Sequence, residues 1–63
     1  MSVKEIKSAV DNGLIVHWSN NSYTVIPSRG DYLIQHLNGS CTGLTWKDGV
    51  TLNGDEKEFY TPN

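Results

Sequence analysis

The chain has 63 residues, enough for one small domain, and a single cysteine. A domain of this size buries only about 60% of the surface that its unfolded chain exposes, so disulfides, a metal or a partner chain usually support it. One cysteine excludes an internal disulfide, and His17, His36 and Cys41 lack the paired spacing of zinc sites. We therefore expect no metal and no cofactor, and we expect a homo-oligomer, a dimer or a larger assembly, to supply the support.

The formal net charge of −2 narrows the choice of partners. Binding to DNA or RNA polymers requires clustered Lys and Arg, whereas the five basic residues are scattered here. A small anion remains a suitable ligand, because one cation assisted by hydrogen bonds can hold it. No segment has the apolar core of a signal peptide or the length of a membrane span. These features predict a cytoplasmic protein with no membrane partner.

The N-terminal segment predicts one helix over residues of about 3–12. Ser2 and Glu5 have the spacing of a capping box at its start, and Asn12-Gly13 supplies a left-handed stop at its end. One face of this helix is apolar and is expected to pack on the rest of the chain. Its residues are Val3, Ile6 and Val10, with Ala9 beside them.

The remainder, about 14–60, alternates strand-forming runs with turn formers. The runs cover residues 14–18, 23–26, 32–37, 41–46 and 50–53, with a short closing run at 59–60. Consecutive strands with short connections pair antiparallel, so we expect a meander. The predicted fold of the single domain, 1–63, is α+β. It has an N-terminal helix followed by a five- to six-stranded antiparallel meander, either a curled sheet or a small SH3-like barrel.

Alternation within the strands separates core candidates from half-buried residues. Trp18 shares a face with Leu14 and Val16, which favours a place in the core. His17 and His36 alternate with apolar residues and are expected to be half-buried sheet histidines. Cys41 is interpreted as a small buried apolar residue. A Cys–His catalytic pair would need a third orienting group and a cleft, so we expect no catalytic residues and no enzyme activity.

The segment 43–54 is the best candidate for a binding site. Asp48-Gly49 predicts a tight hairpin, Trp46 offers a flat stacking surface, and Lys47 offers a cation. In Ser-Arg-Gly-Asp, Arg29 is the one residue that turn chemistry does not explain, and arginine suits bidentate phosphate contacts. These features also have structural explanations. A Lys-Asp pair at the tip of a hairpin is often simply exposed to solvent, and threonines paired across neighbouring strands stabilise a sheet. The candidate ligand-binding residues are Trp46, Thr45, Lys47, Thr42, Ser40, Arg29, Asn53 and Asn20.

The chain resembles a widespread group of very small proteins encoded by bacteriophages and prophages. The resemblance covers nearly the whole chain, and its most specific part is Gly-Leu-Thr-Trp-x-Asp-Gly-x-Thr-Leu-Asn-Gly at 43–54. Small phage proteins of this build are similar to anti-defence factors, including oligomeric sponges that sequester cyclic nucleotide messengers of CBASS-type immunity. The resemblance implies a non-enzymatic sponge for a small nucleotide, such as a cyclic di- or trinucleotide, acting in the host cytoplasm.

A second hypothesis comes from a different class of function. The same mixed apolar and polar face would also suit a small protein-binding inhibitor or adaptor that acts on a host protein. The two hypotheses differ in what they predict for nucleotides. A sponge gains thermal stability when it binds one, by the linkage of binding and folding, whereas an inhibitor captures a host protein instead.

Overall fold

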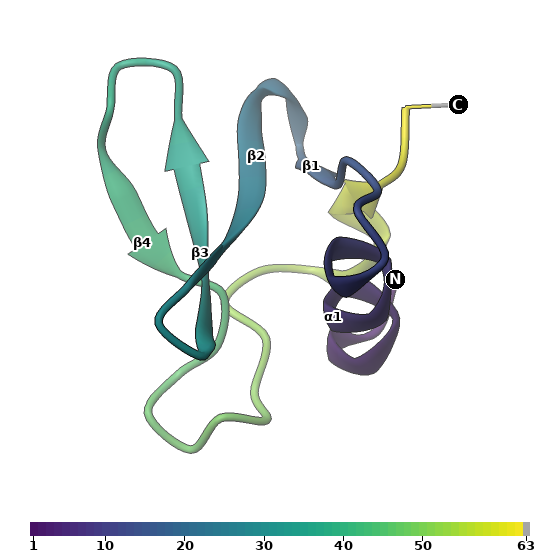
Figure 1. Ribbon diagram of the computed structural model, residues 1–63, viewed down its shortest axis with the longest axis vertical. Helices are drawn as coiled ribbons and strands as arrows, with labels where there is room; N and C mark the ends of the chain where they lie inside the picture. Colours follow the sequence, from purple (N-terminus) through teal and green to yellow (C-terminus); the bar gives the residue numbers. More distant parts are fainter. Residues whose placement is uncertain (63) are drawn as a thin grey trace.

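The computed structural model describes residues 1–62, and the last residue of the predicted domain, Asn63, lies outside them. One helix, α1 (Val3–Asp11), precedes a five-stranded antiparallel sheet of order β4-β3-β2-β1-β5. Figure 1 shows α1 beside the sheet and a long loop extending below β3 and β4. The elements after the helix are β1 (His17–Trp18), β2 (Asn20–Ser28), β3 (Asp31–His36), β4 (Cys41–Gly43), the short 3-10 helix η1 (Glu56–Glu58) and β5 (Phe59–Tyr60). The predicted α+β class is confirmed.

Local chemistry accounts for both ends of α1. The Ser2 N–H donates to Glu5 Oε1 (2.8 Å), and the Glu5 N–H donates to Ser2 Oγ (3.1 Å), so the capping box is formed. At the other end Gly13 adopts φ +79°, and the N–H of Leu14 donates back to the Ala9 carbonyl (3.0 Å). The predicted helix limits are confirmed to within about one residue. The first predicted strand starts late, at residue 17, because residue 14 still completes the helix end.

The first four strands form the predicted meander, and the fifth returns to its other edge. β5 pairs with β1, placing Tyr60 opposite His17 and Phe59 opposite Trp18. β4 and β5 are therefore the two outer strands, and the sheet is not closed into a barrel. Of the two predicted architectures, the open curled sheet is the one that forms.

β2 is longer than predicted because Pro27 does not end it. Pro27 pairs with Tyr32 of β3. The Tyr32 carbonyl accepts from the Leu44 N–H (3.1 Å) on the far side, so this pair lies at a position without ladder hydrogen bonds. β1 pairs with β2 only as far as Thr24, so it does not reach the proline either. Because the sheet uses no backbone N–H at this position, Pro27 is accommodated and the strand continues.

The predicted strands at 41–46 and 50–53 differ most from the structure. β4 ends at Gly43, and the segment from Leu44 to Asn53, called here the 44–53 loop, contains a single bridge between Thr45 and Leu52. The physical reason is Asp48, whose carboxylate accepts from the backbone N–H groups of Val50 and Thr51 (both 2.9 Å). A side chain that holds these donors competes directly with strand pairing.

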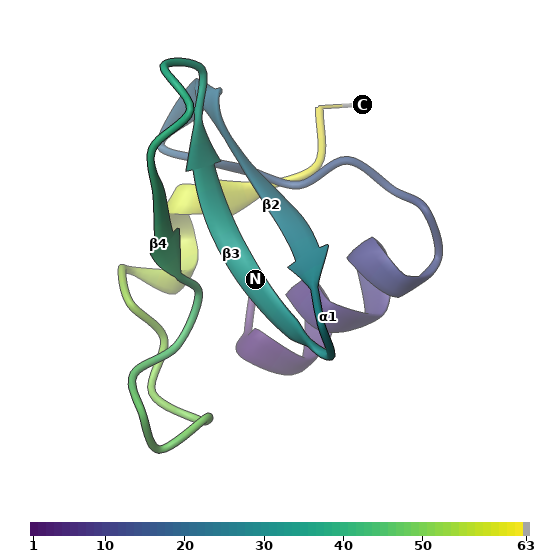
Figure 2. The same cartoon turned by 60° about the vertical axis from the view of Figure 1, so that its left-hand side comes forward.

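The hydrophobic core is formed by residues of α1, of the strands and of the 44–53 loop, and Figures 1 and 2 show α1 on one side of the sheet. Trp18 packs against this core as predicted, although it is only partly buried, and His17 and His36 are half-buried. Cys41 corrects the prediction, because it is exposed on the outer strand β4. Because β4 is an outer strand, it has a neighbouring strand on one side only. The buried residues are Ile6, Ala9, Val16, Val25, Ile34, Leu44 and Phe59.

Candidate functional site

The 44–53 loop is anchored at its base and open at its tip. Leu44 is buried in the core, and its carbonyl accepts from the Asn53 N–H (2.8 Å). Above this anchor the Trp46 N–H donates to the Thr51 carbonyl (2.9 Å). The Trp46 side chain nevertheless stays 65% exposed. An indole held on a fixed backbone in water is a surface on which a planar ligand can stack.

A pocket of about 240 Å³ lies next to Trp46. The loop contributes Thr45, Trp46 and Lys47 to its walls, so three of the predicted site residues come together. The beginning of β3 also lines the pocket, with three consecutive residues that are acidic, aromatic and aliphatic. The lining residues from outside the predicted set are Asp31, Tyr32, Leu33, Gly43 and Gly49.

Asp48 organises the tip of the loop rather than the pocket. Besides the two backbone donors, its carboxylate accepts from the Thr51 hydroxyl. The Thr51 hydroxyl, followed by the N–H groups of Thr51 and Val50, lowers the pKa of Asp48 below its ordinary value of 3.8. The charged form is thus the one that fits the loop, and Asp48 has a structural explanation.

Asn53 and Thr42 tie the loop to β4. The Asn53 side-chain amide donates to the Gly43 carbonyl (3.1 Å) and lies 3.4 Å from Thr42 Oγ1. Both residues belong to the predicted site, yet neither lines the pocket. These contacts fasten the end of the loop to β4, next to the position where Thr45 and Trp46 follow the strand.

The other three predicted site residues lie elsewhere. Ser40 sits in the β3–β4 turn, bonded to Asn38, and about 10 Å along the strand from Gly43, the lining residue of the pocket that is nearest to it in the chain. Asn20 begins β2, where its side chain accepts from the Ser22 N–H (2.8 Å). Arg29 occupies the β2–β3 turn with φ +52°, a left-handed conformation that costs a non-glycine residue about 1–2 kcal/mol. It lies two residues before Asp31 but does not line the pocket.

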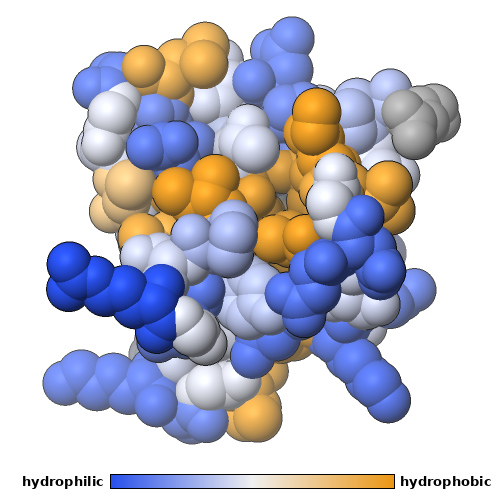
Figure 3. All heavy atoms as spheres, in the orientation of Figure 1, coloured by the Kyte–Doolittle hydropathy of each residue, from blue (hydrophilic) through white to orange (hydrophobic). Residues whose placement is uncertain are grey.

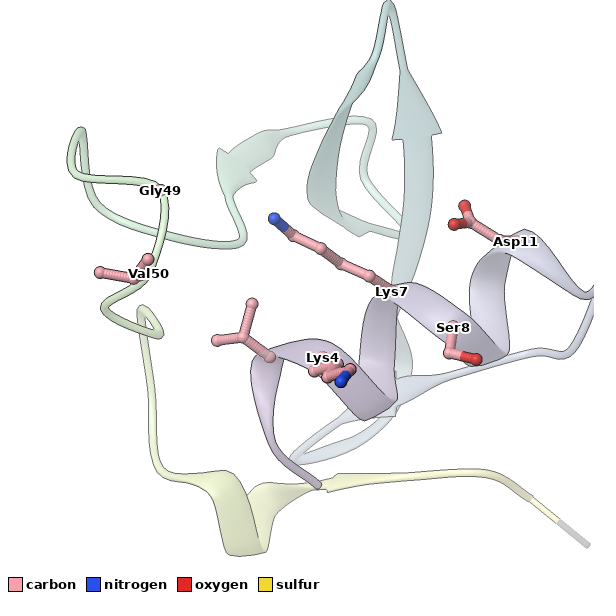
Figure 4. A pocket seen from close by; sticks show the side chains of 7 residues that line it. Lys4, Lys7, Ser8, Asp11, Gly49 and Val50 are labelled. Carbon is pink, nitrogen blue, oxygen red and sulfur yellow. The ribbon is translucent and has the colours of Figure 1, made fainter.

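A second, larger pocket of about 540 Å³ adjoins the first. It lies between α1 and the tip of the loop, and Gly49 lines both pockets. Figure 4 shows the Lys7 side chain extending from α1 toward the segment that carries Gly49 and Val50. The helix contributes Val3, Lys4, Lys7, Ser8 and Asp11 to this pocket.

Tyr32 connects the two pockets. Its ring lies 5.4 Å from the Lys7 ammonium, measured to the ring centroid, and its hydroxyl donates to Asp11 Oδ1 (2.6 Å). This hydrogen bond is the main cause that raises the pKa of Tyr32. The phenol therefore remains protonated at neutral pH and keeps β3 fastened to the end of α1.

The sequence-based prediction missed the helical side of this site. Lys4, Lys7 and Asp11 recur at the three- and four-residue spacing that places side chains on one face of a helix. This spacing indicates a charged helix face from the sequence alone. It could not show that the 44–53 loop lies opposite that face. In Figure 3, long hydrophilic side chains project from the lower and left-hand margins, where the loop and the β2–β3 turn lie.

Within residues 1–62, no group of three His, Cys, Asp or Glu side chains is arranged to hold a metal ion. The helices of this part of the chain are also too short to cross a membrane. The groups that come together near the loop are a stacking surface, ammonium groups and hydrogen-bonding groups.

No protein-family model, curated protein or solved structure matches this chain.

Proposed function

We propose that this protein binds and sequesters a small nucleotide at the pocket beside Trp46. The observation that carries the proposal is the exposed Trp46 indole on a hydrogen-bonded loop, next to a pocket lined by Lys47 and Thr45. A nucleobase stacked on an indole gains about 1–3 kcal/mol, and it needs no net positive charge. Sequestration rather than turnover fits a site built from stacking and hydrogen-bonding groups.

The polar groups of the pocket suit the other parts of a nucleotide. Lys47 supplies a cation for a phosphate. Asp31 is an acceptor, and a carboxylate near a nucleotide site commonly accepts from ribose hydroxyls. The threonine hydroxyl of Thr45 can both donate and accept. The pocket thus has one group for each chemical part of the ligand.

The biological role in the proposal rests on the resemblance of segment 43–54 to small phage proteins. Under it, the protein is a phage-encoded anti-defence sponge for a cyclic oligonucleotide, and two or more copies of the chain form its sites. The exposed Leu14 (50%) and Ile15 (56%) support self-association, because adjacent exposed apolar residues favour burial against another chain.

A second candidate is a protein-binding inhibitor or adaptor that acts on a host protein. The observation in its favour is that Trp46 (65% exposed) and Val50 (74% exposed) lie on the same loop. Exposed tryptophan with a neighbouring apolar residue is the composition of a protein-interface hot spot.

Trp46→Ala is the test of the proposed function. We expect a panel of nucleotides, including cyclic di- and trinucleotides, to contain a ligand that raises the melting temperature of the protein. The variant should weaken its binding about 5- to 150-fold, which corresponds to the loss of one stacked base. Isothermal titration calorimetry measures this loss.

The matched control is Leu37→Ala, which also removes an exposed apolar side chain (77% exposed) but lies in the β3–β4 turn region away from the pocket. It should bind as the natural protein does. A panel in which no nucleotide shifts the melting temperature contradicts the proposal. Capture of one host protein that is lost on Trp46→Ala would then support the second candidate.

A further inference from the structure

The larger pocket, between α1 and the tip of the 44–53 loop, is a site of its own. It shares a single lining residue, Gly49, with the pocket beside Trp46. Its volume of about 540 Å³ lies within the roughly 300–1,000 Å³ typical of small-molecule sites. A ligand of ordinary size can therefore occupy this pocket without entering the other one.

Lys7 brings an ammonium group to this pocket in a defined position. Figure 4 shows its side chain extending from α1 toward the segment of Gly49 and Val50, and the residue is only partly exposed. The ammonium lies 5.4 Å from the centroid of the Tyr32 ring. That ring is itself held, because its hydroxyl donates to Asp11 (2.6 Å). The cation is thus positioned before a ligand arrives, which lowers the entropy that binding would cost.

The helix offers several hydrogen-bond donors to one anion at this place. An ammonium group carries three N–H donors, and the Tyr32 ring faces that of Lys7 on one side only. The donors that point elsewhere suit the oxygens of a carboxylate. Ser8, the next residue of α1, and Lys4, one turn earlier, line the same pocket and have donors of their own.

The charge of the lining suits a ligand with one negative charge. Lys4 and Lys7 are its two cations and Asp11 is its one carboxylate, so the lining has a net charge of +1. One oxygen of Asp11 already accepts from the Tyr32 hydroxyl. A ligand with a single carboxylate neutralises this lining, whereas a polyphosphate would leave negative charge without a partner.

The remaining walls are apolar. Val3 lies at the start of α1, and Val50 lies on the loop with 74% of its surface exposed. The aliphatic stems of the two lysines add to this surface. Apolar groups in water gain free energy when a ligand covers them. The pocket therefore combines an apolar surface with a cation at one position.

We propose that the larger pocket binds a monocarboxylate with a compact apolar body, such as an arylalkanoic or branched-chain alkanoic acid. Lys7 and Ser8 hold the carboxylate, and Val3 and Val50 contact the apolar part. This inference goes beyond the proposed nucleotide binding, because it assigns a second site and another class of ligand. The competing explanation is an apolar surface that takes any hydrophobic compound and makes no use of the cation.

Three probes separate the two parts of the ligand on the full chain: phenylpropionate, phenylpropionamide and acetate. The amide keeps the shape of phenylpropionate but has no charge, and acetate keeps the charge but has no ring. We expect phenylpropionate to bind at least tenfold more tightly than either, a difference of about 1.4 kcal/mol. Titrations followed by the backbone amide resonances, at neutral pH and fixed salt, measure the dissociation constants. The largest shifts should fall on the first turns of α1 and on residues 49–50.

Lys7→Met removes the charge and keeps an apolar stem. Phenylpropionate should bind this variant about tenfold more weakly, whereas binding of phenylpropionamide should stay the same. Lys57→Met is the matched control, because it removes the same charge from η1, which does not line the pocket. It should leave the binding of all three probes unchanged.

Val50→Thr tests the apolar wall, since it keeps the shape of the side chain and adds a hydroxyl. It should weaken the binding of phenylpropionate and of the amide by the same factor. A circular dichroism spectrum shows that each variant is folded. Both variants therefore report on one pocket through different parts of the ligand.

Several outcomes would overturn the second site. An amide that binds as tightly as phenylpropionate shows that the cation is not used, and acetate that binds as tightly shows that the apolar walls are not. An equal loss in Lys7→Met and Lys57→Met indicates a general effect of charge. If no probe binds, or if the shifts fall away from α1 and the loop, the inference is wrong, while the nucleotide site beside Trp46 is tested separately.

Discussion

Among the glycines of the described residues, Gly54 has the least room for a side chain. Its φ is +152°, and a Cβ added there would lie 2.8 Å from Trp18 Nε1 and 3.3 Å from the Phe59 ring. Both of those residues belong to the core or pack against it, so neither can move away cheaply. This close approach explains why a glycine follows directly after the 44–53 loop.

Gly54→Ala is expected to lower the free energy of unfolding by about 2–4 kcal/mol, from backbone strain and overpacking together. Gly39→Ala is the control, because Gly39 also has a positive φ (+93°) but open space around its Cα. It should cost only about 1–2 kcal/mol. Urea denaturation measures both, and equal losses would contradict the steric explanation.

At the scale of elements, the 44–53 loop owes its shape to one carboxylate. Asp48 accepts from three donors of Val50 and Thr51, and its lowered pKa shows that these bonds favour the ionised form. A group whose pKa is lower in the folded state contributes stability above its unfolded pKa and loses it as the pH falls through the folded value. Acid should therefore loosen this loop.

Asp48→Asn removes that pH dependence. The amide keeps one acceptor oxygen but cannot ionise, so the variant should be less stable than the natural protein at pH 7, and the difference should shrink as the pH falls from about 4 toward 2. Thermal unfolding across this range measures it. The Glu5 carboxylate, whose pKa is also lowered by its bonds with Ser2, titrates in both proteins and cancels in the comparison. A constant difference between the two proteins over this range would show that the charge of Asp48 has no part in holding the loop.

At the scale of the whole molecule, only seven side chains make up the buried hydrophobic core of the described residues. Such a small core leaves little stability in reserve, which is why we expect the chain to assemble with copies of itself. For an assembled protein the melting temperature rises with protein concentration. Light scattering and thermal scans over a hundredfold range of concentration test this, and a single-chain mass with a constant melting temperature would refute it.

The helix and the pairing of the first four strands were predictable because local chemistry specifies them. Ser2 and Glu5 cap each other within one turn, and Gly13 ends α1 through its own left-handed backbone. Hairpin pairing likewise follows from short connections. The limits of β4 were not predictable, since the Asp48 side chain competes with strand pairing and the sequence pattern of Thr and Val favours a strand.

Three of the eight candidate ligand-binding residues lie together beside the smaller pocket. Trp46, Thr45 and Lys47 come from one short segment, so their neighbourhood follows from the sequence. Ser40 and Asn20 were grouped with them by residue type, but the strand register places both toward the other end of the sheet, and neither lines the pocket. Residue type alone carries no information on which end of a strand a side chain occupies.

The sequence by itself determined the class of fold, the capped helix and the turn that follows Trp46, because each depends on interactions between residues close together in the chain. Only the tertiary structure decided that Lys4 and Lys7 of α1 face that loop, that Cys41 is exposed and that β5 returns to β1. These features depend on how the packed core orients α1 on the sheet. That orientation arises from contacts between distant residues, which no local pattern records.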